Sequence, residues 1–358
     1  MSDGGYSDDF EDDATASEEE EAPAAATASA TVSTCGLGDF KSIRYDELEL
    51  NQTDVIGGGG FALVYGGFFE GEAVACKALF DPRCDESLRQ EFMDELLVMG
   101  QLTHPNVVEL LGACIEPPKM VFVMERCDAS LFATLHQGRC DLGTKARVQI
   151  GADVGRALAY MHDGFSPSLV HRDIKSHNVL LTRDGVAKLC DFGLVSAPQR
   201  GAGTPAYMAP ELLSYRCASC VARLALLAPC AAACAFLLLT TSTATARPRS
   251  FSRKVDVYAF GVLLWELLAR SGSPWIGFEP SDLRAKVLVG DRLDIPAYEC
   301  PVDAQEMIAQ CWAQAPGDRP EMAPVVRRLD ELGERLFDSI GGGGGGFGED
   351  DALAALMR

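Results

Sequence analysis

The amino-terminal part of this 358-residue chain lacks basic side chains: no Lys or Arg precedes Lys41, although ten Asp and Glu residues fall among the first 21. It also lacks an apolar run at its start, so a secretory signal peptide is not expected. The formal net charge of the whole chain is −21. Because so acidic a surface repels phosphodiester backbones, a general nucleic-acid-binding function is excluded.

Long hydrophobic segments are scarce as well. Residues 224–239 form a run of 16 apolar residues, which contains Pro229 and directly follows Arg223. A helix that spans a membrane needs about 20 such residues. We therefore expect no membrane association through 224–239. We interpret the surrounding segment 216–248 as an atypical surface insertion, or as sequence that should have been spliced out.

Histidine is rare, and none of the five histidines lies near the closely spaced pairs Cys217/Cys220 and Cys230/Cys234. A zinc site at these pairs is therefore not expected, because histidine ligands and polar supporting groups are missing around them. The thirteen cysteines are scattered and odd in number. This pattern argues against a disulfide framework and indicates a reducing, cytoplasmic location.

Composition divides the chain into three parts. Residues 1–43 are acidic and then rich in Ala, Ser and Thr, so they predict a disordered tail. Residues 338–358 contain six consecutive glycines and predict a flexible carboxyl-terminal tail. The structured part is therefore expected at 44–337.

Within 44–337 the hydrophobic pattern changes character. Short β-branched and aromatic runs between Leu48 and Phe80 predict antiparallel strands, and apolar residues at helical spacing predict a helix over 86–102. A further strand pair is expected around 107–111 and 120–124, and helices, notably 146–161 and 257–268, from Leu142 onward. The expected fold class is α+β with two lobes. A small antiparallel sheet with one main helix would occupy 44–127, and a larger, mainly helical lobe would occupy 128–337.

The first chemical signal is a glycine-rich segment from Ile56 to Tyr65. A loop that covers phosphate groups needs backbone N–H groups free of Cβ atoms, but any glycine-rich hairpin has a similar composition. The second signal is Lys77, which ends an apolar strand. A buried lysine needs a partner, and both nucleotide phosphates and Glu95 could supply one. An exposed cation at the strand end is the alternative.

The third signal decides between these alternatives. His171-Arg172-Asp173-Ile174-Lys175-Ser176-His177-Asn178 is followed by apolar residues and then by Asp191-Phe192-Gly193. The Asp173 carboxylate can take a proton from a hydroxyl group. The Asn178 amide oxygen and the Asp191 carboxylate are suitable Mg²⁺ ligands. In this order and spacing, the motifs make the sequence similar to the eukaryotic protein kinases over nearly all of 48–337.

The resemblance implies a role for each matching residue. The ATP-binding positions would be Ile56, Gly57, Gly59, Val64, Ala75, Lys77, Met124, Glu125 and Cys127. Of these, Met124 would be the gatekeeper, and the backbone of 125–127 would meet adenine. Glu95 would pair with Lys77, Asp173 would be the catalytic base, and Lys175 would neutralise the γ-phosphate. Asn178 and Asp191 would hold Mg²⁺, with Mn²⁺ as a second possible ion. Glu211 would pair with Arg319, and Asp256 would support the catalytic loop.

The resemblance also implies a branch and a substrate class. Lys175 and the segment 203–207 resemble serine/threonine rather than tyrosine kinases. The segments 45–50 and 102–108, together with Cys311-Trp312, resemble the tyrosine-kinase-like branch with its Raf-related and mixed-lineage groups. The expected partners are proteins that carry serine or threonine.

Some alternatives stay open at this point. Three features favour a catalytically weak pseudokinase that acts as a scaffold. They are Ala62 in place of the third loop glycine, a short activation segment (191–211) and the insertion. A small-molecule phosphotransferase is a further rival. Thr204 is either a structural contact to the catalytic loop or, like Ser196, a phosphorylation site. Cys190 is either a small core residue or a modifiable thiol.

Overall fold

The computed structural model describes residues 40–58, 62–79, 86–116, 119–138, 142–195, 203–214, 251–270 and 272–341. Gly59, Ser196 and the segment 216–248 lie outside these residues, as do 1–39 and 342–358. Among the described helices, none combines the length and the apolar character that crossing a membrane requires.

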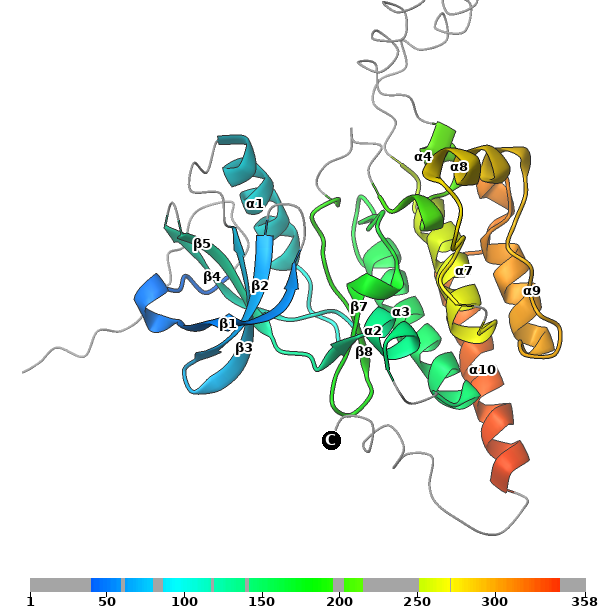
Figure 1. Ribbon diagram of the computed structural model, residues 1–358, viewed down its shortest axis with the longest axis horizontal. Coiled ribbons are helices and arrows are strands. Elements are labelled where there is room, and N and C mark those ends of the chain that lie inside the picture. Colours follow the sequence, from blue (N-terminus) through cyan, green and yellow to red (C-terminus); the bar gives the residue numbers. More distant parts are fainter. Residues whose placement is uncertain are drawn as a thin grey trace, which may run out of the picture. The chain divides into compact units, whose positions relative to one another are not determined.

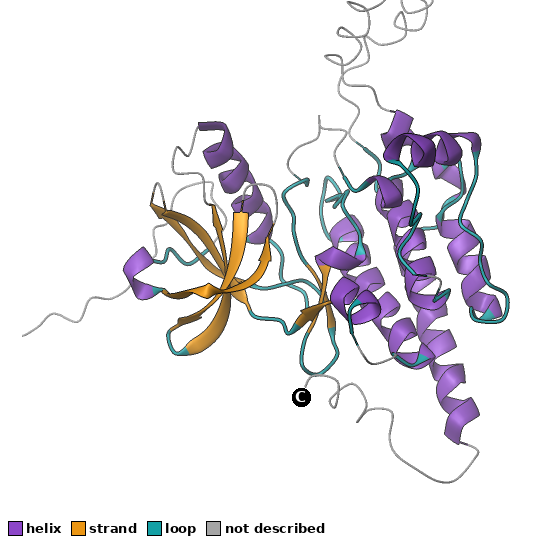
Figure 2. Ribbon diagram, viewed as in Figure 1, coloured by secondary structure: helices purple, strands orange, loops and turns teal. Residues whose placement is uncertain are grey.

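The amino-terminal lobe is built on a five-stranded antiparallel sheet (Figures 1 and 2). Its strands are β1 (Glu49–Gly58), β2 (Ala62–Phe69), β3 (Glu72–Leu79), β4 (Leu110–Glu116) and β5 (Lys119–Glu125). They are ordered β1-β2-β3-β5-β4. The turn between β2 and β3 consists of Glu70 and Gly71, which both have positive φ angles. A two-residue turn of this kind matches the twist of the paired strands.

One helix, α1 (Glu86–Met99), packs against this sheet. Phe92 stacks on Phe122 of β5 with ring centroids 4.0 Å apart, and Leu96 is fully buried one turn further on. Since residues three and four apart share one face of a helix, Glu95 lies on the same buried side as these apolar residues.

The carboxyl-terminal lobe is mainly helical. Its helices are α2 (Leu131–His136), α3 (Thr144–Asp163), α4 (Pro210–Ser214), α7 (Lys254–Leu268), α8 (Pro280–Val289), α9 (Val302–Cys311) and α10 (Met322–Gly341). A small antiparallel sheet consists of β6 (Ala129–Ser130), β7 (Val179–Leu181) and β8 (Ala187–Leu189). Short 3₁₀ turns lie at Tyr45–Glu47, Ser176–Asn178, Pro205–Tyr207 and Pro316–Asp318. Figure 1 shows α3 packed beside α7 and α10.

Helix α7 forms the centre of this lobe. Every residue from Val255 to Leu268 is buried, including Asp256 and Glu266. A helix that is buried on all sides needs partners for any charged side chain that it carries. The partners of these two carboxylates lead directly to the functional site.

The expected fold class is confirmed, and the predicted strands and helices are present with some displaced boundaries. The helix expected over 86–102 ends at Met99. We expected a strand over 107–111, but β4 begins at Leu110. Val107 and Val108 are buried by a different contact: Val107 forms a bridge with Leu189, and the Val108 N–H donates to the Leu189 carbonyl oxygen. Apolar residues buried by packing beside a strand look the same in sequence as the strand itself.

The described structure extends a few residues beyond the expected limits of 44–337 at both ends. At the amino-terminal end, Ser42 bridges to Ala113 of β4, and Ile43 is only 2% exposed. Packing therefore begins within the segment that we had assigned to the tail 1–43. At the other end, α10 continues to Gly341, past the expected limit at 337. Short stretches of this kind gain their order from contacts that composition does not reveal.

Candidate active site

The strand register brings the proposed nucleotide-binding side chains to one face of the sheet. Gly57 lies opposite Val64, Val64 opposite Lys77, and Ala75 opposite Met124. Cross-strand partners share a face, and so do residues two apart on one strand, such as Ala75 and Lys77. Val64, Ala75, Lys77 and Met124 therefore lie on the same side of the sheet.

Lys77 is the charged group on this face. Its ammonium donates to Glu95 of α1 at 2.7 Å and to Asp191 at 3.3 Å. The expected Lys77–Glu95 contact is therefore present. The Lys77 side chain is only 22% exposed, so Lys77 is not the exposed cation that was the alternative interpretation. Residues 77, 95 and 191 come from a strand, a helix and a loop.

The electrostatics of this cluster favour the charged forms of Lys77 and Asp191, whereas burial raises the pKa of Glu95. Burial alone would lower the pKa of Lys77, but the carboxylates of Glu95 and Asp191 outweigh burial and raise it. Burial would likewise raise the pKa of Asp191, but Lys77, His171 and Lys175 together outweigh burial and lower it. Lys77 thus stays a cation and Asp191 an anion at neutral pH.

Asp173 is held from both sides. Its Oδ1 accepts from the Thr204 backbone N–H at 3.0 Å and from the Thr204 hydroxyl at 2.9 Å. Its Oδ2 accepts from Lys175 Nζ at 2.6 Å and from Asn178 Nδ2 at 3.1 Å. Lys175 also donates to the Thr204 hydroxyl at 2.9 Å. Of the two interpretations of Thr204 left open above, these hydrogen bonds fit the structural contact to the catalytic loop.

Asn178 and Asp191 are linked through the backbone. The N–H of Cys190, directly before Asp191, donates to the Asn178 carbonyl oxygen at 2.9 Å. Asp191 has a φ of 66°, in the left-handed region that non-glycine residues rarely adopt. Such a conformation has an energetic cost and persists where its surroundings enforce it, which is common at functional sites. The next residue, Phe192, is fully buried against the His171 ring.

The donor set fits a magnesium ion that also binds phosphates. Asn178 Nδ2 donates to the Asp173 carbonyl oxygen and to Asp173 Oδ2, so the Asn178 Oδ1 oxygen is the group suited to a cation. Together with the Asp191 carboxylate it provides hard oxygen ligands. Among the described residues no three His, Cys, Asp or Glu side chains gather as a metal cluster. Mg²⁺ commonly uses one or two protein ligands and takes the remainder from water and phosphates.

Asp256 supports the catalytic loop from within α7. Its carboxylate accepts from the backbone N–H of His171 at 2.8 Å and of Arg172 at 2.7 Å, and its Oδ2 lies 2.9 Å from His162 Nε2. Arg172 has a φ of 68°, so Asp256 stabilises a strained turn directly before Asp173. Glu211 and Arg319 form the expected pair through two hydrogen bonds of 2.6 and 2.9 Å.

The remaining candidates lie around the hinge and the glycine-rich loop. The Glu125 N–H donates to the Glu109 carbonyl oxygen, and its carboxylate accepts from Lys188 at 2.7 Å. Burial raises the pKa of the Cys127 thiol to about 12. Ile56 is 41% exposed on β1, and Gly59 lies outside the described residues. Burial also raises the pKa of the partly buried Cys190, which disfavours its reactive thiolate form.

Sequence reasoning missed three residues of the site: His162, Ser176 and Glu266. His162 contacts Asp256, and the Ser176 hydroxyl donates to Glu266 at 2.8 Å. A signal for Glu266 was available, because it is a lone acid in the apolar stretch 257–268, where a buried carboxylate requires partners. No local signal identifies those partners, since they are distant in sequence.

Two family profiles match the chain. The profile of the protein kinase domain matches residues 50–222, and that of the protein tyrosine and serine/threonine kinases matches residues 241–329. The two matches leave out 223–240, which lies inside the segment that we interpret as an insertion. With the two-lobed fold and the site just described, these matches show that the chain belongs to the protein kinase family, whose members use ATP and a divalent metal ion.

Similar proteins point to one branch of that family. The chain is 32% identical over 295 residues to the serine/threonine-protein kinase CTR1 of Arabidopsis thaliana, covering 79% of this chain and 32% of that protein. It is 31% identical over 321 residues to the human mitogen-activated protein kinase kinase kinase 10, covering 85% of this chain and 30% of that protein. The chain thus spans about a third of the length of these relatives. The two similarities confirm the predicted Raf-related and mixed-lineage branch.

Proposed function

We propose that the chain is a serine/threonine protein kinase, which transfers the γ-phosphate of MgATP to hydroxyl groups of protein substrates. The observation that carries this proposal is the arrangement around Asp173. A carboxylate suited to accept a hydroxyl proton lies within 3.1 Å of Lys175 and Asn178, while Lys77, Glu95 and Asp191 form a second charged cluster. The names of the relatives agree with this proposal, because one is a serine/threonine-protein kinase and the other a mitogen-activated protein kinase kinase kinase.

Each residue has a defined task in this proposal. Asp173 orients the attacking hydroxyl and takes its proton, and Lys175 offsets charge on the transferring phosphoryl group. Lys77, held by Glu95, contacts the phosphates of the nucleotide. Asn178 and Asp191 hold Mg²⁺, which would neutralise charge on the phosphate oxygens when bound. Catalysis of this type depends mainly on positioning and on charge neutralisation.

The compartment and the partners follow from the same proposal. Protein substrates would meet the segment from Thr204 to Glu211, whose end is tied to Arg319. The six cysteines of the described residues are free thiols, which supports a reducing, cytoplasmic location. No nucleic-acid partner is expected.

The direct test is transfer of radiolabelled phosphate to a peptide library, with and without Mg²⁺. Wild-type protein should label serine and threonine only when Mg²⁺ is present. Asp191→Ala should lower the rate by about 100-fold or more with little change in unfolding temperature, and Asp173→Asn should behave similarly. Asp330→Asn, which removes a surface partner of Arg156, is the matched control and should retain the wild-type rate.

Three results would contradict the proposal. Nucleotide binding without any transfer would instead support the scaffold alternative. Labelling of tyrosine would overturn the substrate class. Wild-type turnover in Asp191→Ala would remove the metal role from that residue.

A further inference from the structure

Residues 51–54 of β1 form a bulge in the pairing between β1 and β2. The paired residues Leu50 and Val55 are separated by these four residues, whereas their partners on β2 are separated by Gly66 alone. A bulge bends its strand and changes the direction of a side chain, and bulges are frequent next to active sites. The residues of this bulge therefore do not follow the regular alternation of the strand.

The last residue of the bulge, Asp54, forms an ion pair with Arg126. Asp54 Oδ2 lies 3.0 Å from Arg126 Nη1, and both side chains are 36% exposed. Arg126 directly follows β5, in the segment 125–127 whose backbone would meet adenine. Asp54 precedes Ile56, the first residue of the glycine-rich segment, by two positions. The ion pair therefore joins the strand that leads into the glycine-rich segment to the hinge.

Gly66 provides the space for this ion pair. A Cβ atom added at Gly66 would lie less than 3.0 Å from both the Asp54 carboxylate and the Arg126 guanidinium, closer than real Cβ atoms approach. Gly66 does not have a positive φ angle, so its backbone conformation does not require glycine. A glycine inside a strand often marks a place where another group comes close. At Gly66 that group is the Asp54–Arg126 pair.

The ion pair lies on the side of the sheet that carries the ATP-binding candidates. Gly66 lies opposite Ala75 and two residues from Val64 on β2. Residues in these two relations share a face of the sheet. Because the missing Cβ of Gly66 would point at the ion pair, the pair lies on the same face as Val64 and Ala75.

The neighbouring hinge residue contacts the other lobe. The Glu125 carboxylate accepts from Lys188 Nζ at 2.7 Å, and Lys188 belongs to β8 of the carboxyl-terminal lobe. Two consecutive hinge side chains are thus held by opposite charges, Glu125 from the carboxyl-terminal lobe and Arg126 from β1. A nucleotide between the two lobes would lie beside both contacts.

We propose that Asp54 and Arg126 are positioning residues for nucleotide binding, because their ion pair fixes the end of β1 to the hinge and slows the release of ATP. The inference rests on the proposed kinase function. A nucleotide bound between the glycine-rich segment and the hinge leaves more easily when the two separate, and the ion pair opposes that separation. Since a partly exposed ion pair contributes little free energy, we expect a change of a few fold, mainly in the dissociation rate.

The test measures the release of a fluorescent ATP analogue by stopped flow, and KM for ATP and for a peptide, on the full chain. Asp54→Asn and Arg126→Gln should each speed release about threefold and raise KM for ATP by about the same factor, with the peptide KM within about twofold. The double variant should add less than about 1.5-fold to either single change, because both remove one interaction.

Charge exchange and salt give a second readout, which a merely structural role would not move. Asp54→Arg alone places two cations side by side and should speed release about fivefold. Adding Arg126→Asp restores a pair of opposite charges and should reverse most of that increase. At an ionic strength of about 1 M the differences from wild type should shrink, because salt screens exposed charges.

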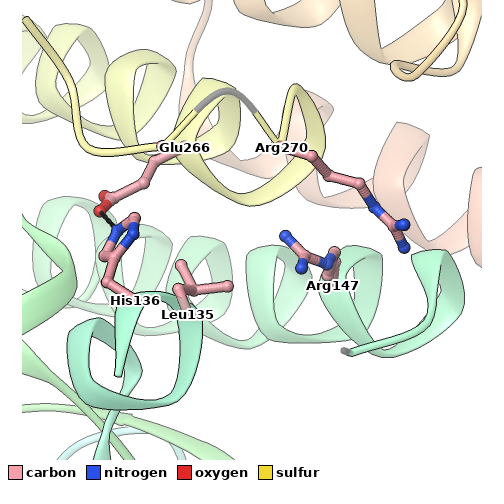
Figure 3. A pocket seen from close by; sticks show the side chains of 6 residues that line it. Leu135, His136, Arg147, Glu266 and Arg270 are labelled. Carbon is pink, nitrogen blue, oxygen red and sulfur yellow. Dashed lines mark hydrogen bonds and ion pairs between the residues drawn. The ribbon is translucent and has the colours of Figure 1, made fainter. Parts of the chain in front are cut away.

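Two matched controls remove charges elsewhere. Asp291→Asn takes away the partner of Lys286 in another exposed ion pair, of 3.3 Å. Arg270→Gln removes a guanidinium that lines a cavity of about 250 Å³ in the carboxyl-terminal lobe. Figure 3 shows Arg270 beside Arg147 at one end of this cavity, where both donate to the Leu142 carbonyl oxygen. Neither control should change nucleotide release by more than about 1.5-fold.

Three results would overturn the inference while the kinase proposal stands. They are wild-type release rates in both Asp54→Asn and Arg126→Gln, equal acceleration in the controls, and a charge exchange that fails to slow release relative to Asp54→Arg.

Failure of the proposed function gives a different result. Wild-type protein would then bind the nucleotide but transfer no phosphate, and faster release in the variants would still support the role of the ion pair. Wild-type protein that binds no nucleotide would reject both proposals.

Discussion

At the scale of single residues, the site depends on carboxylates that are buried together with their donors. Asp256 has no exposed surface, yet burial is outweighed by its hydrogen bonds with His162 and the backbone of the catalytic loop, which lower its pKa. An acid whose pKa is lower in the folded state stabilises the fold at pH values above its ordinary pKa near 3.8. That stability is lost as the pH falls through the lower, folded-state pKa.

The lowered pKa of Asp256 leads to a prediction for the variant Asp256→Asn. At pH 7 the variant should be less stable than wild type by about 3 kcal/mol, because it loses charge-assisted hydrogen bonds to two buried N–H groups. Between pH 5 and pH 3 the difference should shrink, since only wild type loses the contribution of the ionised carboxylate. Urea denaturation midpoints at pH 7, 5, 4 and 3 provide the measurement. A difference that stays constant over this range would show that Asp256 is not the titrating group.

At the scale of elements, close packing of helices around α7 sets the frame on which the catalytic loop rests. Gly261 of α7 faces α9: a Cβ atom added there would lie 2.8 Å from the Cβ of Cys311 and 3.1 Å from the Trp312 backbone nitrogen. Since real Cβ atoms do not approach so closely, one helix would have to move. The glycine is therefore required by packing rather than by its backbone conformation.

Gly261→Ala should consequently lower the free energy of unfolding by about 1–3 kcal/mol, the usual cost of overpacking a core. Gly317→Ala is the matched control, because a Cβ atom at Gly317 meets nothing within 4 Å. It should stay within about 0.5 kcal/mol of wild type. Thermal and urea unfolding of the two variants would decide, and equal stabilities would contradict the close approach of α7 and α9.

At the scale of the whole molecule, the family matches stop before and resume after residues 223–240. The segment 216–248 lies outside the described residues, so its interpretation as an insertion stays a prediction. The entropy of closing a longer loop is small, about 0.6 kcal/mol for each doubling of its length. An apolar run of 16 residues exposed to water, in contrast, promotes association.

A chain from which 216–248 has been deleted should therefore be more soluble than the full chain and should transfer phosphate at the same rate. Sedimentation of expressed protein and the peptide-library assay measure the two properties. A deletion variant that is insoluble, or soluble but inactive, would show that the segment belongs to the working protein.

The sequence alone determined the fold class, the two lobes, and the candidates Lys77, Glu95, Asp173, Asn178 and Asp191. Fixed motifs carry these residues, and hydrophobic periodicity marks the elements that bear them. The displaced start of β4 and the packed residues 40–43 escaped prediction, because burial by a neighbouring segment leaves the same apolar pattern as strand pairing.

The tertiary structure decided which groups meet. Thr204 reaches Asp173 across 31 residues, and Glu266 reaches Ser176 across 90 and His136 across 130. Hydrogen bonds between such distant residues have no local signature. A charged residue within an apolar stretch of the sequence indicates only that partners must exist. The packing of α2, the catalytic loop and the activation segment around α7 determines which residues those partners are.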